Sequence, residues 1–111
     1  MSASLYSIEQ LQAQLAPVFQ KNGVRKAILF GSYAKGTAQP ASDVDLWVDS
    51  GLRGLSFFGL LEDVCRCVQC KVDLIDRADV IPGSAVDREI HNTGMVIYEQ
   101  LKNAAHPTKN D

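Results

Sequence analysis

The sequence predicts an α+β fold in which a small mixed β-sheet is flanked by helices. Apolar residues recur at helical spacing in two segments, 8–20 and 57–68. Short apolar or alternating runs, which are typical of strands, occupy 24–30, 43–48 and 71–76. Helices and strands that alternate along a chain of 111 residues fit one layered domain around a single core.

The first helix is expected over Ile8–Gln20. Ser7 and Gln10 form the pattern of a capping box at its start. Pro17 conflicts with the second half of this helix, because proline lacks an N–H and crowds the preceding turn; it should kink or shorten the helix there. The apolar stripe of the helix consists of Ile8, Leu11, Leu15, Val18 and Phe19.

A strand and a glycine-serine turn are expected next. Val24–Phe30 ends in an apolar run, as a central buried strand does. Gly31 and Ser32 form a turn after it, Tyr33–Lys35 makes one helical turn, and Gly36 stops that turn.

The second strand, Asp43–Val48, carries two carboxylates on one face. Side chains alternate along a strand with period two, so Asp43, Asp45 and Trp47 share a face. The opposite face is apolar and consists of Val44, Leu46 and Val48.

A third carboxylate is expected on the same open face. The third strand is predicted over Lys71–Asp76, and there Val72 and Leu74 face a covering helix while Asp73 and Ile75 face the other way. The covering helix has its apolar stripe at Phe57, Leu60, Leu61, Val64 and Val68.

The last helix and strand complete the predicted sheet. Pro82 is expected in the first turn of a helix that Val86 and Ile90 anchor and Gly94 terminates. Met95–Tyr98 is expected to form a short fourth strand. We expect residues 1–102 to form one domain, and residues 103–111, which are polar and without periodicity, to form a loose tail.

The carboxylates and the turn together predict a site for phosphates and metal ions. Two aspartates at i, i+2 lie roughly 6 Å apart and repel each other by about 3 kcal/mol at an effective dielectric of 20. Divalent cations relieve such repulsion, and oxygen ligands select hard ions such as Mg²⁺. In the Gly31-Ser32 turn, peptide N–H groups and the serine hydroxyl can bind phosphate oxygens. A chance occurrence of Gly-Ser-x10-Asp-x-Asp in such a chain is on the order of one in a thousand.

Composition narrows the function classes. The net charge is −2 and no cluster of Lys and Arg is present, which disfavours nucleic acid as the main partner. The sequence contains no run of about eighteen apolar residues, so no membrane span is predicted. The first residues lack a basic start followed by an apolar run, so we expect a cytoplasmic protein without a secretory signal.

The three cysteines are expected to be reduced thiols. Cys65, Cys67 and Cys70 are an odd number crowded into six positions, which does not suit a disulfide framework. A zinc site would need a fourth ligand, which His91 and His106 do not supply.

At these motifs the chain resembles a known family. Over roughly residues 8 to 100 it is similar to the minimal nucleotidyltransferases of the DNA polymerase beta-like superfamily, and in particular to the small MNT antitoxins encoded beside HEPN-domain toxins. Lys35 stands where arginine is common, which keeps the charge but loses two-pronged hydrogen bonding. The motifs are Leu29-Phe30-Gly31-Ser32-x-Ala34-Lys35-Gly36, Ser42-Asp43-x-Asp45-Leu46 and Lys71-Val72-Asp73-Leu74-Ile75.

The resemblance implies transfer of AMP from ATP to a hydroxyl, a tyrosine of a partner HEPN toxin, with release of pyrophosphate. It implies two Mg²⁺ ions held by Asp43, Asp45 and Asp73, with Asp73 available to take the acceptor proton. Gly31 and Ser32 would bind the β and γ phosphates with electrostatic help from Lys35. The implied partners are ATP and the toxin, in a possible homo-oligomer or hetero-oligomer.

Other residues and functions remain open at this point. Trp47 either stacks on the base or, more commonly for a strand tryptophan, packs. Tyr33 is either a modification site or an aromatic that flanks the turn, and His91 is expected on a helix surface. The alternative functions are a non-catalytic antitoxin that blocks its partner by binding, and nucleotidyl transfer to a small molecule.

Overall fold

A mixed four-stranded sheet lies at the centre of the structure, a computed structural model that describes residues 6–100. Its strand order is β3-β2-β1-β4; β1 runs antiparallel to β2 and β4, whereas β2 and β3 are parallel. This confirms the predicted α+β class with a mixed sheet. The elements are α1 (Ile8–Lys21), β1 (Lys26–Phe30), α2 (Ser32–Lys35), β2 (Val44–Asp49), α3 (Leu55–Cys67), β3 (Val72–Asp76), the 3-10 helix η1 (Arg77–Asp79), α4 (Ala85–Thr93) and β4 (Met95–Glu99).

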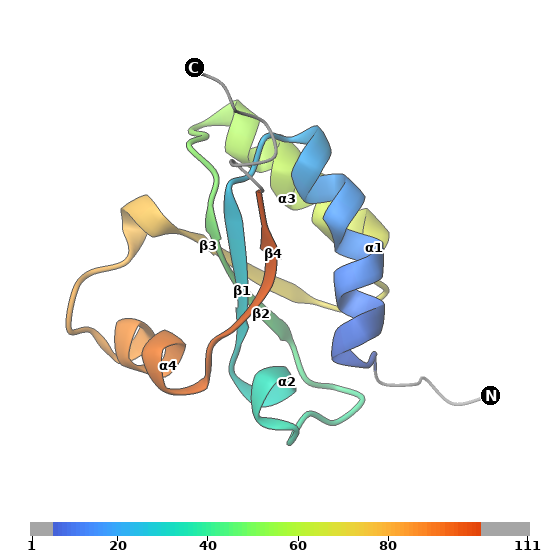
Figure 1. Cartoon of the computed structure of the whole chain (residues 1–111), viewed down its shortest axis with the longest axis vertical. Coiled ribbons are helices and arrows are strands. Elements are labelled where there is room, and N and C mark those ends of the chain that lie inside the picture. Colours follow the sequence, from blue (N-terminus) through green and yellow to red (C-terminus); the bar gives the residue numbers. More distant parts are fainter. Residues whose placement is uncertain (1–5, 101–111) are drawn as a thin grey trace, which may run out of the picture.

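The two faces of the sheet have different covers. Helices α1 and α3 pack on one face, and α4 with the segment before it lies on the other (Figure 1). The core lies under α1 and α3, because the apolar side of each strand turns toward them; on β2 the predicted alternation is confirmed residue by residue. Fully buried core residues include Leu11, Leu15, Phe19, Ala27, Leu29, Val44, Leu46, Val48, Leu60 and Val64.

Helix α1 begins at the predicted capping box but is longer than expected. The Ser7 hydroxyl accepts from the Gln10 N–H at 3.0 Å, and the Ser7 N–H donates to the Gln10 side-chain carbonyl at 2.8 Å. Pro17 lies inside the helix without shortening it. Proline has no N–H, so Pro17 cannot donate to the carbonyl of Ala13. Both residues are exposed, and water can bind this carbonyl instead.

The start of α4 differs from the prediction. Pro82 lies in the turn before the helix, and Ser84 caps the helix by accepting from the Asp87 N–H at 3.2 Å. A serine side chain satisfies a free N–H at a helix start, which explains why the helix begins there. Val86 is exposed, so Ile90 is the buried anchor of α4, and Gly94 ends the helix as expected.

Within residues 6–100 no helix is long and apolar enough to cross a membrane. The predicted tail and His106 lie outside the described residues.

Candidate active site

The glycine-serine turn follows β1 and has a conformation that requires glycine. Gly31 has φ 75° and ψ −149°, a region essentially restricted to glycine. A Cβ built on Gly31 would overlap the carboxylate of Asp45. Ser32–Lys35 then form the single helical turn α2, which Gly36 ends as predicted; the structure adds that Gly36 is in a left-handed conformation. The turn therefore touches the second strand through the one residue type that permits such close approach.

The three predicted carboxylates lie on one face of the sheet, the face on which α4 packs. Asp45 of β2 is directly opposite Phe30 of β1 on one side and in register with Asp73 of β3 on the other. Asp43 immediately precedes β2 and is half-buried, like Asp45, whereas Asp73 is exposed. Neighbouring strands lie about 4.8 Å apart, so Asp73 is next to Asp45.

Burial, together with the negative charge of this cluster, raises the pKa of Asp45 to about 6. Burial is the largest cause, and the negative charges of Asp73, Asp43 and Glu89 add to it. A carboxylate in this environment is strained as an anion without a compensating cation. The site is thus electrostatically prepared for positive charge.

The donors fit a hard divalent cation, although they are not arranged around one point. All three side chains offer oxygen, which Mg²⁺ prefers. Among residues 6–100, no three His, Cys, Asp or Glu side chains lie close enough to hold one ion together as they stand. The exposed Asp73 and the half-buried Asp43 would therefore have to turn toward Asp45 to share an ion.

Helix α4 supplies two contacts to the turn that sequence reasoning missed. The Gly31 N–H donates to the Thr93 hydroxyl at 3.1 Å, and that hydroxyl donates to the Glu89 carbonyl at 2.8 Å. The Glu89 carboxylate also pairs with the Lys35 ammonium at 3.7 Å. Thr93 lies 62 residues from Gly31, and no local pattern marks it. In this structure Gly31 contributes its shape, while its own N–H is already bound.

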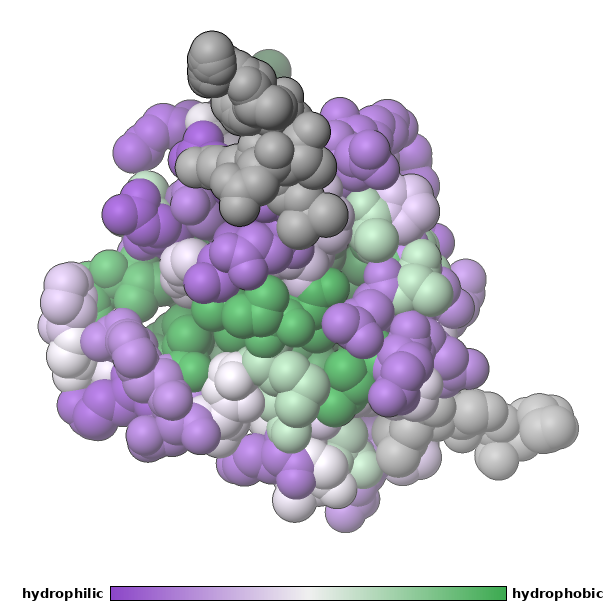
Figure 2. Space-filling model, in the orientation of Figure 1, coloured by the Kyte–Doolittle hydropathy of each residue, from purple (hydrophilic) through white to green (hydrophobic). Residues whose placement is uncertain are grey.

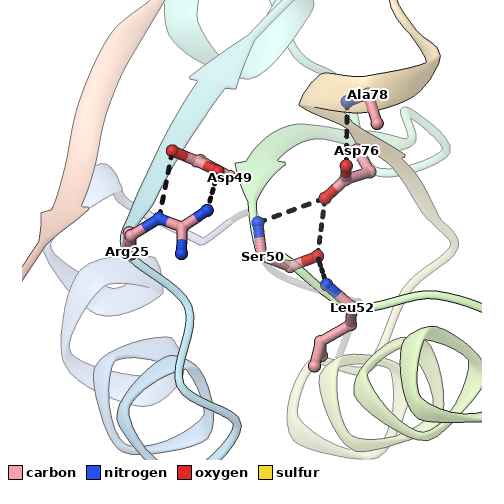
Figure 3. Close-up of polar contacts among 6 residues, drawn as sticks. All are labelled: Arg25, Asp49, Ser50, Leu52, Asp76 and Ala78. Carbon is pink, nitrogen blue, oxygen red and sulfur yellow. Dashed lines mark hydrogen bonds and ion pairs between the residues drawn. The ribbon is translucent and has the colours of Figure 1, made fainter.

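A buried polar network holds the strand that carries Asp73. Ser50, after β2, donates through its hydroxyl at 2.6 Å and its N–H at 3.1 Å to Asp76 at the end of β3, and Ala78 donates its N–H to the same carboxylate at 2.8 Å (Figure 3). Burial alone would raise the pKa of Asp76, but these hydrogen bonds and the charge of Arg53 outweigh it and lower the pKa. The network ties the ends of β2 and β3, which keeps Asp73 in register with Asp45.

An ion pair lies beside that network at the same end of the sheet. The Arg25 guanidinium donates to the Asp49 carboxylate, with the shorter contact at 2.9 Å (Figure 3). Both side chains are partly exposed, so the pair adds little stability.

The remaining candidates are placed as follows. Tyr33 is buried, which favours its role as a packing aromatic, and burial is the main cause of its raised pKa. His91 lies exposed on α4, with its Nδ1 3.3 Å from Asp87, as a helix-surface histidine. Trp47 is half-buried and lines a pocket beside Ile28 instead of the core. Cys65, Cys67 and Cys70 are free.

The fold and the site together define an enzyme class. A Gly-Ser turn at the end of a strand, in contact with one of three carboxylates on the neighbouring strands, is suited to holding a nucleotide's phosphates where charge must be neutralised. That is the arrangement of an enzyme that transfers phosphorus-containing groups.

Comparison with known families gives the particular assignment. Residues 13–103 match the family described as Polymerase beta, Nucleotidyltransferase, which is most of the chain. The chain belongs to this family and is a nucleotidyltransferase.

Individual relatives agree with this assignment. The Putative protein adenylyltransferase of Methanocaldococcus jannaschii is 36% identical over 45 residues, which is 40% of this chain; the match spans about half (48%) of that relative's length. A structure described as a "putative minimal nucleotidyltransferase" has a TM-score of 0.66 at 24% identity, covering 83% of this chain and 97% of that one.

Toxin-antitoxin complexes share the fold as well. A chain of a toxin-antitoxin structure with AMP-PNP has a TM-score of 0.68 at 20% identity and covers 83% of this chain and 76% of its own. A chain from the complex of the tri-AMPylated Shewanella oneidensis HEPN toxin with its MNT antitoxin has a TM-score of 0.63 at 16% identity, covering 87% of this chain and 76% of that one.

Proposed function

We propose that this nucleotidyltransferase moves AMP from ATP to a tyrosine hydroxyl of a HEPN-type toxin in the cytoplasm, and acts as its antitoxin. The observation that carries the proposal is the contact between the Gly31 turn and Asp45, with Asp43 and Asp73 on the same face. The likeness to a chain of a toxin-antitoxin structure with AMP-PNP, and to a chain of the complex between an AMPylated HEPN toxin and its MNT antitoxin, supports the choice of nucleotide and partner. In this proposal the working assembly is a hetero-oligomer with the toxin.

The residues of the turn bind the part of ATP that leaves. The Ser32 hydroxyl donates to a β or γ phosphate oxygen, and the shape of Gly31 lets the phosphates approach the backbone. Lys35, now paired with Glu89 at 3.7 Å, exchanges that exposed partner for a phosphate.

The carboxylates bind cations and handle the proton. Asp43, Asp45 and Asp73 would hold Mg²⁺, which when bound stabilises the charge on the attacking and leaving oxygens. The acceptor oxygen bonds to the α-phosphorus as the bond to pyrophosphate breaks. Asp73, the most accessible of the three, takes the proton from the acceptor hydroxyl.

The test is AMP transfer to the purified partner. The protein is incubated with ATP, Mg²⁺ and the HEPN-type protein encoded beside it, and the mass of AMP on the partner is measured. Asp43→Asn and Asp45→Asn should abolish transfer, whereas Asp79→Asn, which removes an exposed carboxylate outside the site, should leave it intact. An unmodified partner that both Asp variants still inhibit would replace this proposal with inhibition by binding alone.

A further inference from the structure

A pocket of about 500 Å³ lies between the sheet and α4, beside the carboxylates. Figure 2 shows apolar side chains gathered around the hollow between the sheet and the segment that precedes α4. The apolar lining consists of Ile28, Trp47, Val80, Pro82 and Ile90, and the charged or polar lining of Lys26, Arg77, Asp87 and His91.

The pocket continues the line of the active site along the strands. Trp47 follows Asp45 by two residues on β2 and therefore faces the same side, about 7 Å farther along. On the antiparallel strand β1, Ile28 is opposite Trp47, Phe30 is opposite Asp45, and Gly31 comes next. The order along the sheet is thus turn, carboxylates, pocket.

This order determines what can enter the pocket. In an in-line displacement the attacking oxygen approaches the α-phosphorus from the side opposite the leaving pyrophosphate. If the turn holds the pyrophosphate and Asp45 marks the α-phosphate, the attacking group approaches from the side of Trp47. We infer that this pocket receives the acceptor side chain, an aromatic hydroxyl flanked by acidic residues. The inference rests on the proposed function, and in particular on pyrophosphate leaving at the turn.

The lining indicates the class of acceptor. An apolar lining that includes the Trp47 indole suits an aromatic ring, which gains more from such contacts than an aliphatic hydroxyl does. The volume is in the range of ligand pockets and is ample for one phenol side chain with its neighbours.

The charges at the rim favour an acidic neighbourhood around the acceptor. Within residues 6–100 Lys26 and Arg77 form no ion pair. Asp87 is the one carboxylate among the lining residues, and it is engaged: it accepts from the Gly83 N–H at 2.8 Å and lies 3.3 Å from His91. Lys26 lies opposite Asp49 of β2 and Glu99 of β4 but forms no ion pair with either, and Asp49 pairs with Arg25. Lys26 and Arg77 can therefore each pair with a carboxylate of a bound segment.

Trp47 is the single tryptophan of the chain, so its fluorescence reports directly on this pocket. The folded protein, without ATP or metal, is titrated with the peptide acetyl-Asp-Tyr-Asp-amide, with acetyl-Ser-Tyr-Ser-amide, and with adenosine. We expect a saturable change of Trp47 emission with both peptides, tighter for the acidic one, and none with adenosine.

Charge variants test the rim separately. Lys26→Gln and Arg77→Gln should each weaken binding of the acidic peptide by about two- to fivefold and leave the neutral peptide unchanged. Lys21→Gln, which removes an exposed lysine at the end of α1 on the opposite face, is the matched control and should change neither.

Two results would overturn the inference. One is the absence of a saturable response to either peptide; the other is a response to adenosine instead, which would assign the pocket to the nucleoside. Neither depends on catalysis, so a failure of AMP transfer would not be mistaken for them. The reverse outcome is also distinguishable. If Lys26→Gln and Arg77→Gln transfer AMP to the partner with an unchanged KM for that partner, the proposed function stands, and the proposed binding of acidic residues by these two cations is wrong.

Discussion

Replacing Gly31 by alanine should damage both stability and activity, and Gly36→Ala offers a matched comparison. Both glycines have positive φ in the same turn, 75° and 78°. A Cβ at Gly36 has no atom within 4 Å, whereas a Cβ at Gly31 overlaps the Asp45 carboxylate. Gly36→Ala therefore reports the cost of backbone strain alone, whereas Gly31→Ala reports backbone strain together with displacement of Asp45.

The magnitudes follow from these two terms. Alanine at Gly31 costs about 1–3 kcal/mol of backbone strain and about 1 kcal/mol to move Asp45 off its rotamer, less about 0.5 kcal/mol gained from a stiffer unfolded chain. We expect a net loss of about 2–3 kcal/mol, or about 10 °C or more in Tm. For Gly36→Ala the left-handed conformation costs about 1–2 kcal/mol, and the net loss is about 1 kcal/mol.

Urea denaturation followed by circular dichroism measures the stability, and the rate of AMP transfer measures the site. A displacement of Asp45 by about 1 Å should lower the rate on the order of a hundredfold in Gly31→Ala, against a few-fold at most in Gly36→Ala. Equal losses of stability and rate in the two variants would show that contact with Asp45 does not matter.

Three further predictions concern the hydrogen bond of Thr93 and the pKa values of Asp76 and Asp45. Thr93→Val removes the acceptor of the Gly31 N–H, so we expect it to lower the free energy of unfolding by about 1–2 kcal/mol and to raise KM for ATP more than it lowers kcat. Thr93→Ser keeps the hydroxyl and should restore both stability and KM. An unchanged KM in the valine variant would refute a positioning role. Asp76 has a lowered pKa, so its charge stabilises the fold above the unfolded pKa of about 4, and this stabilisation is lost as pH falls through the folded pKa. Asp76→Asn should therefore be most destabilising near pH 7 and progressively less so below pH 4, as judged by thermal melts across pH; a destabilisation independent of pH would contradict this. The pKa of Asp45 is shifted in the opposite direction, upward to about 6. Its protonated form therefore stabilises the fold below about pH 4, and this stabilisation is lost as pH rises through 6. Without divalent cations, Asp45→Asn should melt higher than the parent at pH 8 but not at pH 4, and Mg²⁺ should reduce the gain at pH 8; no gain at pH 8 would refute the raised pKa.

Local patterns were enough to predict most of the elements. The capping box at Ser7 and the period-two alternation of β2 act over a few residues, so they can be recognised without knowing the neighbours. Val86 was misplaced for the same reason: helical spacing groups it with Ile90, but only packing against the sheet decides that Ile90 alone is buried.

From the sequence alone we could predict a Gly-Ser turn and three aspartates on a shared face, and the hypothesis that they form one nucleotidyltransferase site. Only the tertiary structure decided that Asp73 lies in register with Asp45, that Asp45 touches Gly31, and that Thr93 binds the Gly31 N–H. It also decided that Trp47 lines a pocket under α4. The physical reason is that periodicity sets which side of an element a residue occupies, whereas strand register and helix packing arise from contacts between residues far apart in the chain.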